Sequence, residues 1–164
     1  MEIYRSERMV IEKTNVFLPS GGSKERIVVR PGKAVAILPC DGDECVLIRQ
    51  YRHAIGRWIY EAPAGTMDAG EIPEETARRE LIEETGMAAT MIEPKGCIYT
   101  TPGYTDEVIY LFGASGLAPS DAYSHDEDEM IEVVHVSRDE MHRMIEDGRI
   151  VDAKTICLAY RCLR

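Results

Sequence analysis

Residues 65–87 read GTMDAGEIPEETARRELIEETGM, and this stretch decides the fold. It predicts a helix over Pro73–Thr85, because proline favours the first turn of a helix and Glu74 and Glu75 lie near the positive end of its dipole. Gly86 follows where a glycine in the left-handed conformation commonly ends a helix. We therefore expect one well-defined helix, preceded by a loop.

Three glutamates share one side of this predicted helix. Glu80 and Glu84 are one turn apart and Glu83 lies three residues after Glu80, so their carboxylates fall on one arc. Like charges at these spacings destabilise a bare helix by roughly a few tenths of a kcal/mol per pair, so we expect a cation among them. Carboxylate oxygens suit Mg²⁺ or Mn²⁺ rather than zinc, and Mg²⁺ often completes its shell with substrate phosphates. The alternative is a solvated acidic face that binds nothing.

The composition is that of one globular domain of ordinary size. The chain has 164 residues, 45% hydrophobic and 29% charged, which excludes a disordered or fibrous protein. Its formal net charge of -10 argues against binding to nucleic acid or to an anionic membrane surface. The apolar runs are too short to span a membrane, and the first eight residues are charged rather than signal-like. We expect a cytoplasmic protein whose anionic substrate is masked by cations.

Short apolar and β-branched runs on both sides of the predicted helix indicate strands. The expected strands are 9–17, 25–30, 33–39, 45–51, 58–61, 97–101, 108–114 and 131–136. Two more helices are expected, one capped by Ser137 and ending at Gly148, and one over 153–163. Strands interspersed with helices favour a layered α/β domain with a mixed sheet and helices on both of its faces.

The cysteines and histidines carry no metal or disulfide signature. Five cysteines are an odd number and contain no Cys-x-x-Cys pair, and the four histidines lack the spacing of metal ligands. We therefore expect reduced thiols throughout.

The complete 65–87 stretch matches the Nudix box, G-x5-E-x7-R-E-U-x-E-E-x-G-U with U aliphatic, and Met87 supplies the final apolar position. Nine positions are fixed across twenty-three residues, and the sequence therefore resembles a Nudix hydrolase. The resemblance implies a Nudix-type α/β/α sandwich with a mixed β-sheet, preceded by N-terminal antiparallel strands. It implies a single domain over 1–164, with the Nudix fold in 33–164 and with 1–32 contributing to dimerisation.

Stretches outside the box are similar to the ADP-ribose pyrophosphatase subfamily. Pro102 stands sixteen residues after Gly86 and is followed by Gly103, and the stretches 49–52, 61–65 and 152–155 also agree with that group. The resemblance implies hydrolysis of ADP-ribose to AMP and ribose 5-phosphate. Rival hypotheses are a pyrophosphatase for a GDP- or UDP-linked hexose, and a regulator that binds ADP-ribose without catalysis.

The same resemblance assigns metal ligands. It implies Glu80, Glu84 and the backbone carbonyl of Ala64 as ligands for two or three Mg²⁺ ions, with Mn²⁺ as a possible replacement. Glu83 is either a further ligand or a carboxylate that orients one, and Glu129 is expected to reach the metal from a later loop.

Further residues are assigned to the reaction and to the substrate. Glu127 is expected to be the general base that deprotonates a metal-bound water, with Glu107 as the runner-up. Arg52, Pro102 and Gly103 are expected to contact the substrate.

The resemblance also implies an assembly. It predicts a homodimer with exchanged N-terminal strands, whose adenine site borrows residues from both subunits. The aromatic side chain that stacks on adenine is left open among Tyr4, Phe17 and Trp58, and for Trp58 the apolar body of the side chain favours a place in the core.

Overall fold

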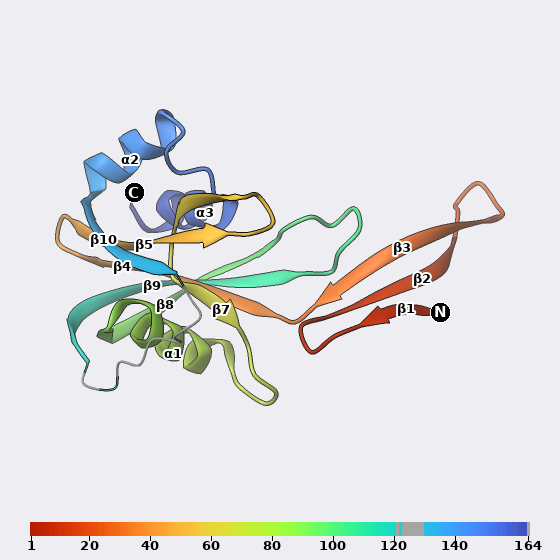
Figure 1. The fold of residues 1–164 in the computed structure, drawn as a ribbon, viewed down its shortest axis with the longest axis horizontal. Helices are drawn as coiled ribbons and strands as arrows, with labels where there is room; N and C mark the ends of the chain where they lie inside the picture. Colours follow the sequence, from red (N-terminus) through yellow and green to blue (C-terminus); the bar gives the residue numbers. More distant parts are fainter. Residues whose placement is uncertain (121, 123–129, 164) are drawn as a thin grey trace.

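The computed structural model describes residues 1–120, 122 and 130–163, whose strands form two sheets (Figure 1). The first is a three-stranded antiparallel sheet in the order β1-β2-β3, formed by β1 (Glu2–Arg5), β2 (Met9–Phe17) and β3 (Ser23–Pro31). The second has seven strands: the order β10-β5-β4-β9-β8 forms its main path, β6 pairs with β5, and β7 pairs with β4. Its strands are β4 (Ala34–Asp41), β5 (Glu44–Arg52), β6 (Arg57–Glu61), β7 (Ala64–Thr66), β8 (Met87–Tyr99), β9 (Val108–Pro119) and β10 (Ile131–Ser137).

Among the described residues, three helices cover the second sheet, α1 (Pro73–Thr85) on one face and α2 (Arg138–Glu146) with α3 (Ala153–Cys162) on the other (Figure 1). Strand β4 lies between β5 and β9 and is parallel to β9, so the sheet is mixed. The expected α/β sandwich with a mixed sheet and preceding N-terminal strands is confirmed. Within the described part of the chain, no helix has both the length and the apolar character needed to cross a membrane.

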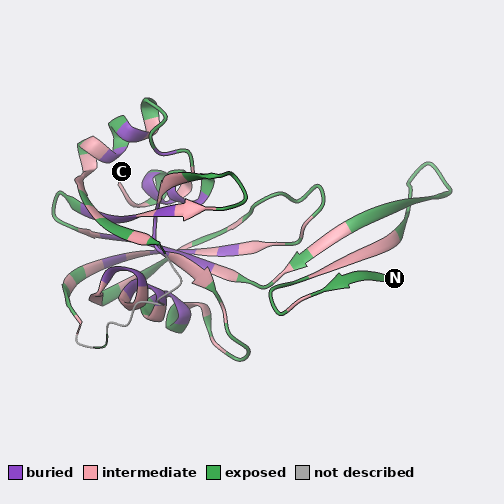
Figure 2. Cartoon of the chain, in the orientation of Figure 1, coloured by how far each residue is buried: buried purple, intermediate pink, exposed green. Residues whose placement is uncertain are grey.

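Strand β4 divides the core between the two layers, because successive side chains of a strand point to opposite faces. Ala36 and Leu38 pack in the cluster that includes the α2 and α3 side chains Met141 and Leu158. Val35 and Ile37 pack in the cluster that includes Ala77 and Leu81 of α1. Figure 2 shows that the buried residues are concentrated where these layers meet. The apolar run in β4 is therefore explained by burial on both of its faces.

Helix α1 begins and ends as the sequence predicts. Ile72 is its N-cap, Pro73 opens the first turn, and Gly86 closes the helix in the left-handed conformation with φ of 71°. The Gly86 N–H donates to the carbonyl of Ile82 at 2.8 Å. This ending turns the chain directly into β8 and fixes the end of the helix that carries Glu83 and Glu84.

Two strands extend well beyond their predicted ranges, and two short strands, β1 and β7, were not predicted. Strand β8 begins at Met87 rather than near Cys97, and β9 continues to Pro119. Pro94 and Gly96 interrupt the apolar alternation of the first half of β8, and the pairing with β9 shifts register between Pro94 and Cys97. Pairing along β9, rather than local propensity, therefore extends β8.

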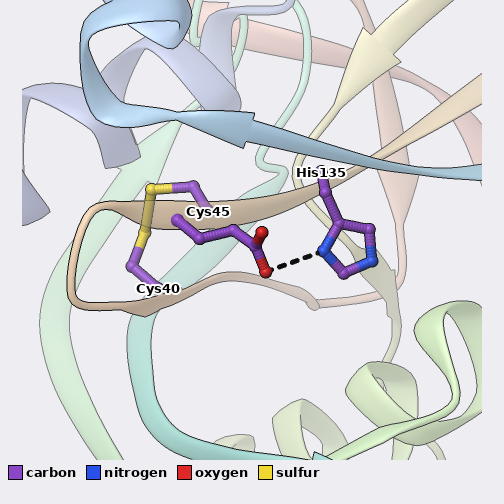
Figure 3. The surroundings of a disulfide bond; sticks show 4 residues. Cys40, Cys45 and His135 are labelled. Carbon is purple, nitrogen blue, oxygen red and sulfur yellow. Dashed lines mark hydrogen bonds and ion pairs between the residues drawn. A yellow bond between two sulfur atoms is a disulfide. The ribbon is translucent and has the colours of Figure 1, made fainter.

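The expectation of reduced cysteines is wrong for one pair. Cys40 and Cys45 form a disulfide across the β4–β5 hairpin (Figure 3), with their Cα atoms 4.1 Å apart. They are direct partners in the antiparallel register, which brings their Cβ atoms close enough for the two sulfur atoms to bond. Motif spacing does not show this, because the contact depends on where the hairpin turns. Cys97, Cys157 and Cys162 are free thiols.

Candidate active site

A cavity of about 700 Å³ lies where α1, β7 and the end of β5 meet. Glu80, Glu83 and Glu84 line it from α1, and Arg52 lines it from β5. The remaining wall comes from the 64–69 segment, from Gly32 and Arg79, and from Glu7 and Arg8 in the turn between β1 and β2. The three carboxylates that the sequence grouped on one arc therefore face one common space.

Arg79 is the cation among these acids. Its Nη1 donates to Glu80 Oε1 at 2.7 Å and to Glu83 Oε2 at 2.8 Å. Its Nε and Nη2 donate to the two carboxylate oxygens of Glu71, each at 3.1 Å. The hydrogen bond with Glu71 is the largest cause that raises the pKa of Arg79, and Glu80 and Glu83 add to it. The guanidinium therefore stays charged and relieves the repulsion between the carboxylates.

Glu71 anchors the loop that precedes α1. It accepts hydrogen bonds from Arg79, from the Asp68 N–H at 2.9 Å and from the Thr76 hydroxyl at 2.8 Å. The bond from Arg79 is the largest cause that lowers the pKa of Glu71, to about 2. This carboxylate therefore ties the loop to the helix rather than facing the cavity.

Strand β7 lies directly against the acidic face of α1. The Ala64 N–H donates to Glu84 Oε2 at 2.7 Å. A Cβ added to Gly65 would lie 2.0 Å from Glu80 Cδ and Oε1, so only glycine leaves room for this carboxylate. Pairing of Ala64 with Ala36 of β4 holds the β7 backbone in that position.

The donor set fits a hard divalent cation. The carboxylate of Glu80 lies against Gly65, and Glu83 and Glu84 line the same cavity, so the site offers carboxylate oxygens, which Mg²⁺ and Mn²⁺ prefer. Across the described residues, no three acidic, histidine or cysteine side chains converge into a preformed metal centre. Glu80 and Glu83 accept hydrogen bonds from Arg79, and Glu84 accepts one from the Ala64 amide, so a bound cation would share these carboxylates with those donors.

Arg52 is held at the cavity by a buried acid. Its Nε and Nη2 donate to Glu61 Oε1 and Oε2 at 2.5 and 2.8 Å, and the Glu61 side chain is only 1% exposed. Burial alone would raise the pKa of Glu61, but the hydrogen bond from Arg52 and the charge of Lys154 outweigh it, so the pKa is lowered. Glu61 is therefore an ionised partner that fixes the guanidinium.

Other residues expected at the site lie elsewhere or outside the described residues. Pro102 and Gly103 are exposed in the β8–β9 loop and do not line the cavity, and Glu107 accepts a hydrogen bond from the Thr100 hydroxyl at 2.5 Å. Bonds to β3 hold this loop against the first sheet, including Val29 N–H to the Tyr104 carbonyl at 2.8 Å. Glu127 and Glu129 fall outside the described residues.

None of the three aromatic candidates for adenine stacking lines the cavity. Trp58 packs edge-on against Tyr51, with ring centroids 5.9 Å apart, and the Arg49 guanidinium lies 4.9 Å from its ring. Tyr4 and Phe17 are exposed on the first sheet.

Sequence reasoning missed Glu7 and Arg8. They reach the cavity from a turn, and no local spacing connects them to the box. Only a pattern of exposed charges in the N-terminal segment could have drawn attention to them.

Comparisons with known proteins agree with this arrangement. A family model described as the NUDIX domain matches residues 30–158. The chain is 35% identical over 156 residues to an ADP-ribose pyrophosphatase of Bacillus subtilis (strain 168), covering 94% of this chain and 84% of that protein. It is 36% identical over 157 residues to a methanol dehydrogenase activator of Bacillus methanolicus, covering 94% and 85%. A crystal structure of an ADP compounds hydrolase superposes with a TM-score of 0.87 at 25% identity, covering 98% of this chain and 87% of that one.

Proposed function

Since the chain belongs to the Nudix family, we propose that it hydrolyses the diphosphate bond of ADP-ribose to AMP and ribose 5-phosphate. The observation that carries this proposal is the common cavity, which is lined by the three glutamates of α1, by Arg52 and by β7. A negatively charged protein needs two kinds of group to hold a diphosphate: carboxylates that bind cations, and a positively charged side chain that binds the phosphates. The similarity to an ADP-ribose pyrophosphatase supports the choice of substrate.

A divalent cation is required by this assignment, and we propose Mg²⁺, in two or three ions, with Mn²⁺ as a substitute. Glu80, Glu84 and the Ala64 carbonyl would hold it, and Glu83 would bind it or orient a ligand. When bound, the cation masks the phosphate charge and lowers the pKa of a coordinated water. Glu129 is proposed to reach the same cations.

The chain's own groups complete the reaction. Glu127 is proposed to accept a proton from the attacking water, with Glu107 as the alternative base. The water oxygen forms a bond to one phosphorus, and the bond between that phosphorus and the bridging oxygen breaks. Each product therefore keeps one phosphate. Arg52 binds the substrate, either at a phosphate or by stacking on the adenine, and both uses suit a planar guanidinium. Pro102 and Gly103 are proposed to contact the substrate from the β8–β9 loop.

The decisive experiment is incubation of the purified protein with ADP-ribose and Mg²⁺, with and without excess EDTA, followed by chromatography of the products. The proposal requires AMP and ribose 5-phosphate that disappear with EDTA. A parallel panel of GDP-mannose, a UDP-hexose and NADH tests the substrate. A higher kcat/KM for GDP-mannose than for ADP-ribose would reassign the enzyme to another nucleoside diphosphate sugar.

One relative is named for activating another enzyme, which makes a regulator that binds ADP-ribose the second candidate. Binding of ADP-ribose with no metal-dependent turnover would identify this role. The complete set of Glu80, Glu83 and Glu84 favours the enzyme, because a protein that only binds the nucleotide has no need for metal-activated water.

We further propose a homodimer that exchanges the N-terminal strands over residues 1–32. In β1, β2 and β3, all within the described residues, no side chain is buried (Figure 2). Ile3, Phe17 and Ile27 are 52%, 85% and 55% exposed, although an isolated small sheet needs a covered apolar face for stability. A second copy would cover it. Sedimentation equilibrium should give twice the 18.4 kDa chain mass, and Ile27→Asp should give a monomer.

A further inference from the structure

Behind Arg52, a line of charged side chains leads from the cavity into the interior. Glu61, whose side chain is 1% exposed, binds Arg52 through both carboxylate oxygens and the Lys154 ammonium through Oε2. Lys154 is itself nearly buried, with a side chain that is 10% exposed, and its Nζ also lies 3.1 Å from Asp152 Oδ1. The carboxylate of Glu61 is thus shared between one cation at the cavity and one in the interior.

The first turn of α3 fixes Lys154 against the end of β6. Asp152 caps the helix and accepts from the Thr155 N–H at 2.9 Å and from its hydroxyl at 2.6 Å. The Thr155 hydroxyl oxygen accepts from the Ala62 N–H at 2.7 Å. Lys154 and Thr155 of α3 therefore bind Glu61 and Ala62. The two residues of each pair lie 93 positions apart in the sequence.

A buried carboxylate with a single cation is poorly compensated, because removing a charge from water costs several kcal/mol unless partners replace the solvent. With Lys154 present, Glu61 has two cationic partners, and both of its oxygens accept hydrogen bonds from Arg52. That bidentate geometry sets the plane of the guanidinium. Without Lys154, Glu61 would move toward solvent or bind a proton, and either change would release Arg52.

We propose that Lys154 is a positioning residue for the substrate: through Glu61 it holds the Arg52 guanidinium in the orientation that binds the nucleotide. This inference rests on the proposed function, because it assigns Arg52 to the substrate. Lys154 does not line the cavity and acts only through its neighbours.

The test is a double-mutant cycle on Lys154→Met and Arg52→Ala, read by titration calorimetry of ADP-ribose binding in EDTA, where no turnover occurs. Lys154→Met should weaken binding roughly 10-fold, the size expected for misplacing a charged hydrogen-bond donor. In the Arg52→Ala background, the same change should alter binding less than about 2-fold, because its effect passes through the missing guanidinium. With Mg²⁺ present, the Lys154→Met single variant should hydrolyse ADP-ribose with a raised KM and a nearly unchanged kcat.

Lys95→Met is the matched control. Lys95 is also a largely covered lysine in an ion pair, 2.7 Å from Glu93, but it lies on β8 outside the cavity. The Lys95→Met protein should bind ADP-ribose with the same affinity as the wild type. If Lys154→Met is unfolded at the assay temperature, Lys154→Gln takes its place in the cycle.

Unchanged binding by the folded Lys154 variant would overturn the inference, and so would an equal loss with and without Arg52, which would indicate a purely structural role. The proposed function is judged separately on the wild type. If the wild type turns over a different nucleoside diphosphate sugar, that compound becomes the probe of the cycle, and the role of Lys154 is decided with it.

Discussion

Gly65→Ala should lower the activity on the order of 10²-fold without unfolding the protein. A Cβ at this position would lie 2.0 Å from Glu80 Cδ and Oε1 and 2.3 Å from Oε2. Ordinary contact begins at 3.4 Å, so the Glu80 carboxylate must withdraw by about 1.4 Å. Misplacing a reacting or metal-binding group by about 1 Å costs on the order of 10²-fold in rate, or about 2.7 kcal/mol of transition-state stabilisation.

Stability should respond much less. The atoms in the way belong to the end of a flexible side chain, and the backbone at Gly65 does not require a positive φ. We expect a change below about 1 kcal/mol, which corresponds to about 2–4 °C in Tm for a chain of this size. Glycine is required here by the close approach of β7 to α1 and not by the turn that follows.

The assay measures kcat/KM for ADP-ribose over a Mg²⁺ titration, with thermal melts of the same samples. Gly113→Ala is the control, since Gly113 also lacks a positive φ and its added Cβ would lie 3.1 Å from the flexible Lys95 Cε, outside the cavity. Its activity should stay within about 3-fold of the wild type, the ordinary range for a surface-side change. Wild-type kcat/KM in a folded Gly65→Ala protein would refute the claim that the Glu80 carboxylate must lie over β7.

Three further changes probe the remaining assignments. Glu84→Gln should lower kcat by several orders of magnitude with an unchanged far-UV spectrum, because the amide is a poor metal ligand; retained activity would remove the metal-site argument. Glu127→Gln should lower kcat roughly 10²- to 10⁴-fold, and if Glu107→Gln is the crippling change instead, the base lies in the β8–β9 loop. Glu71→Gln should destabilise the protein near neutral pH. Because the pKa of Glu71 is lowered to about 2 from an ordinary value of 4.5, its stabilisation is present above 4.5 and is lost as the pH falls toward 2. Denaturant melts of the two proteins should therefore converge over that interval, and a constant difference would contradict the assignment.

The position of helix α1 and the acidic groups on it could be predicted from the amino-acid sequence. Proline, the leading acids and Gly86 are local signals, and α1 begins and ends where they stand. Spacing on a helix likewise sufficed to place Glu80, Glu83 and Glu84 on one face, because that geometry follows from 3.6 residues per turn. The layered fold followed from apolar periodicity, since burial on two faces leaves a continuous apolar run such as β4.

Contacts between residues far apart in the chain could not be predicted in this way. The Cys40–Cys45 disulfide depends on the hairpin register, and the length of β8 depends on its pairing with β9. Gly65 is recognisable in the box, but its close contact with Glu80 arises when β7 pairs with β4. The support of Arg52 by Glu61 and Lys154 joins β5, β6 and the start of α3, and Glu61 and Lys154 are 93 positions apart in the sequence. Such contacts form only when the layers pack and bring distant segments together, so no local pattern in the chain records them.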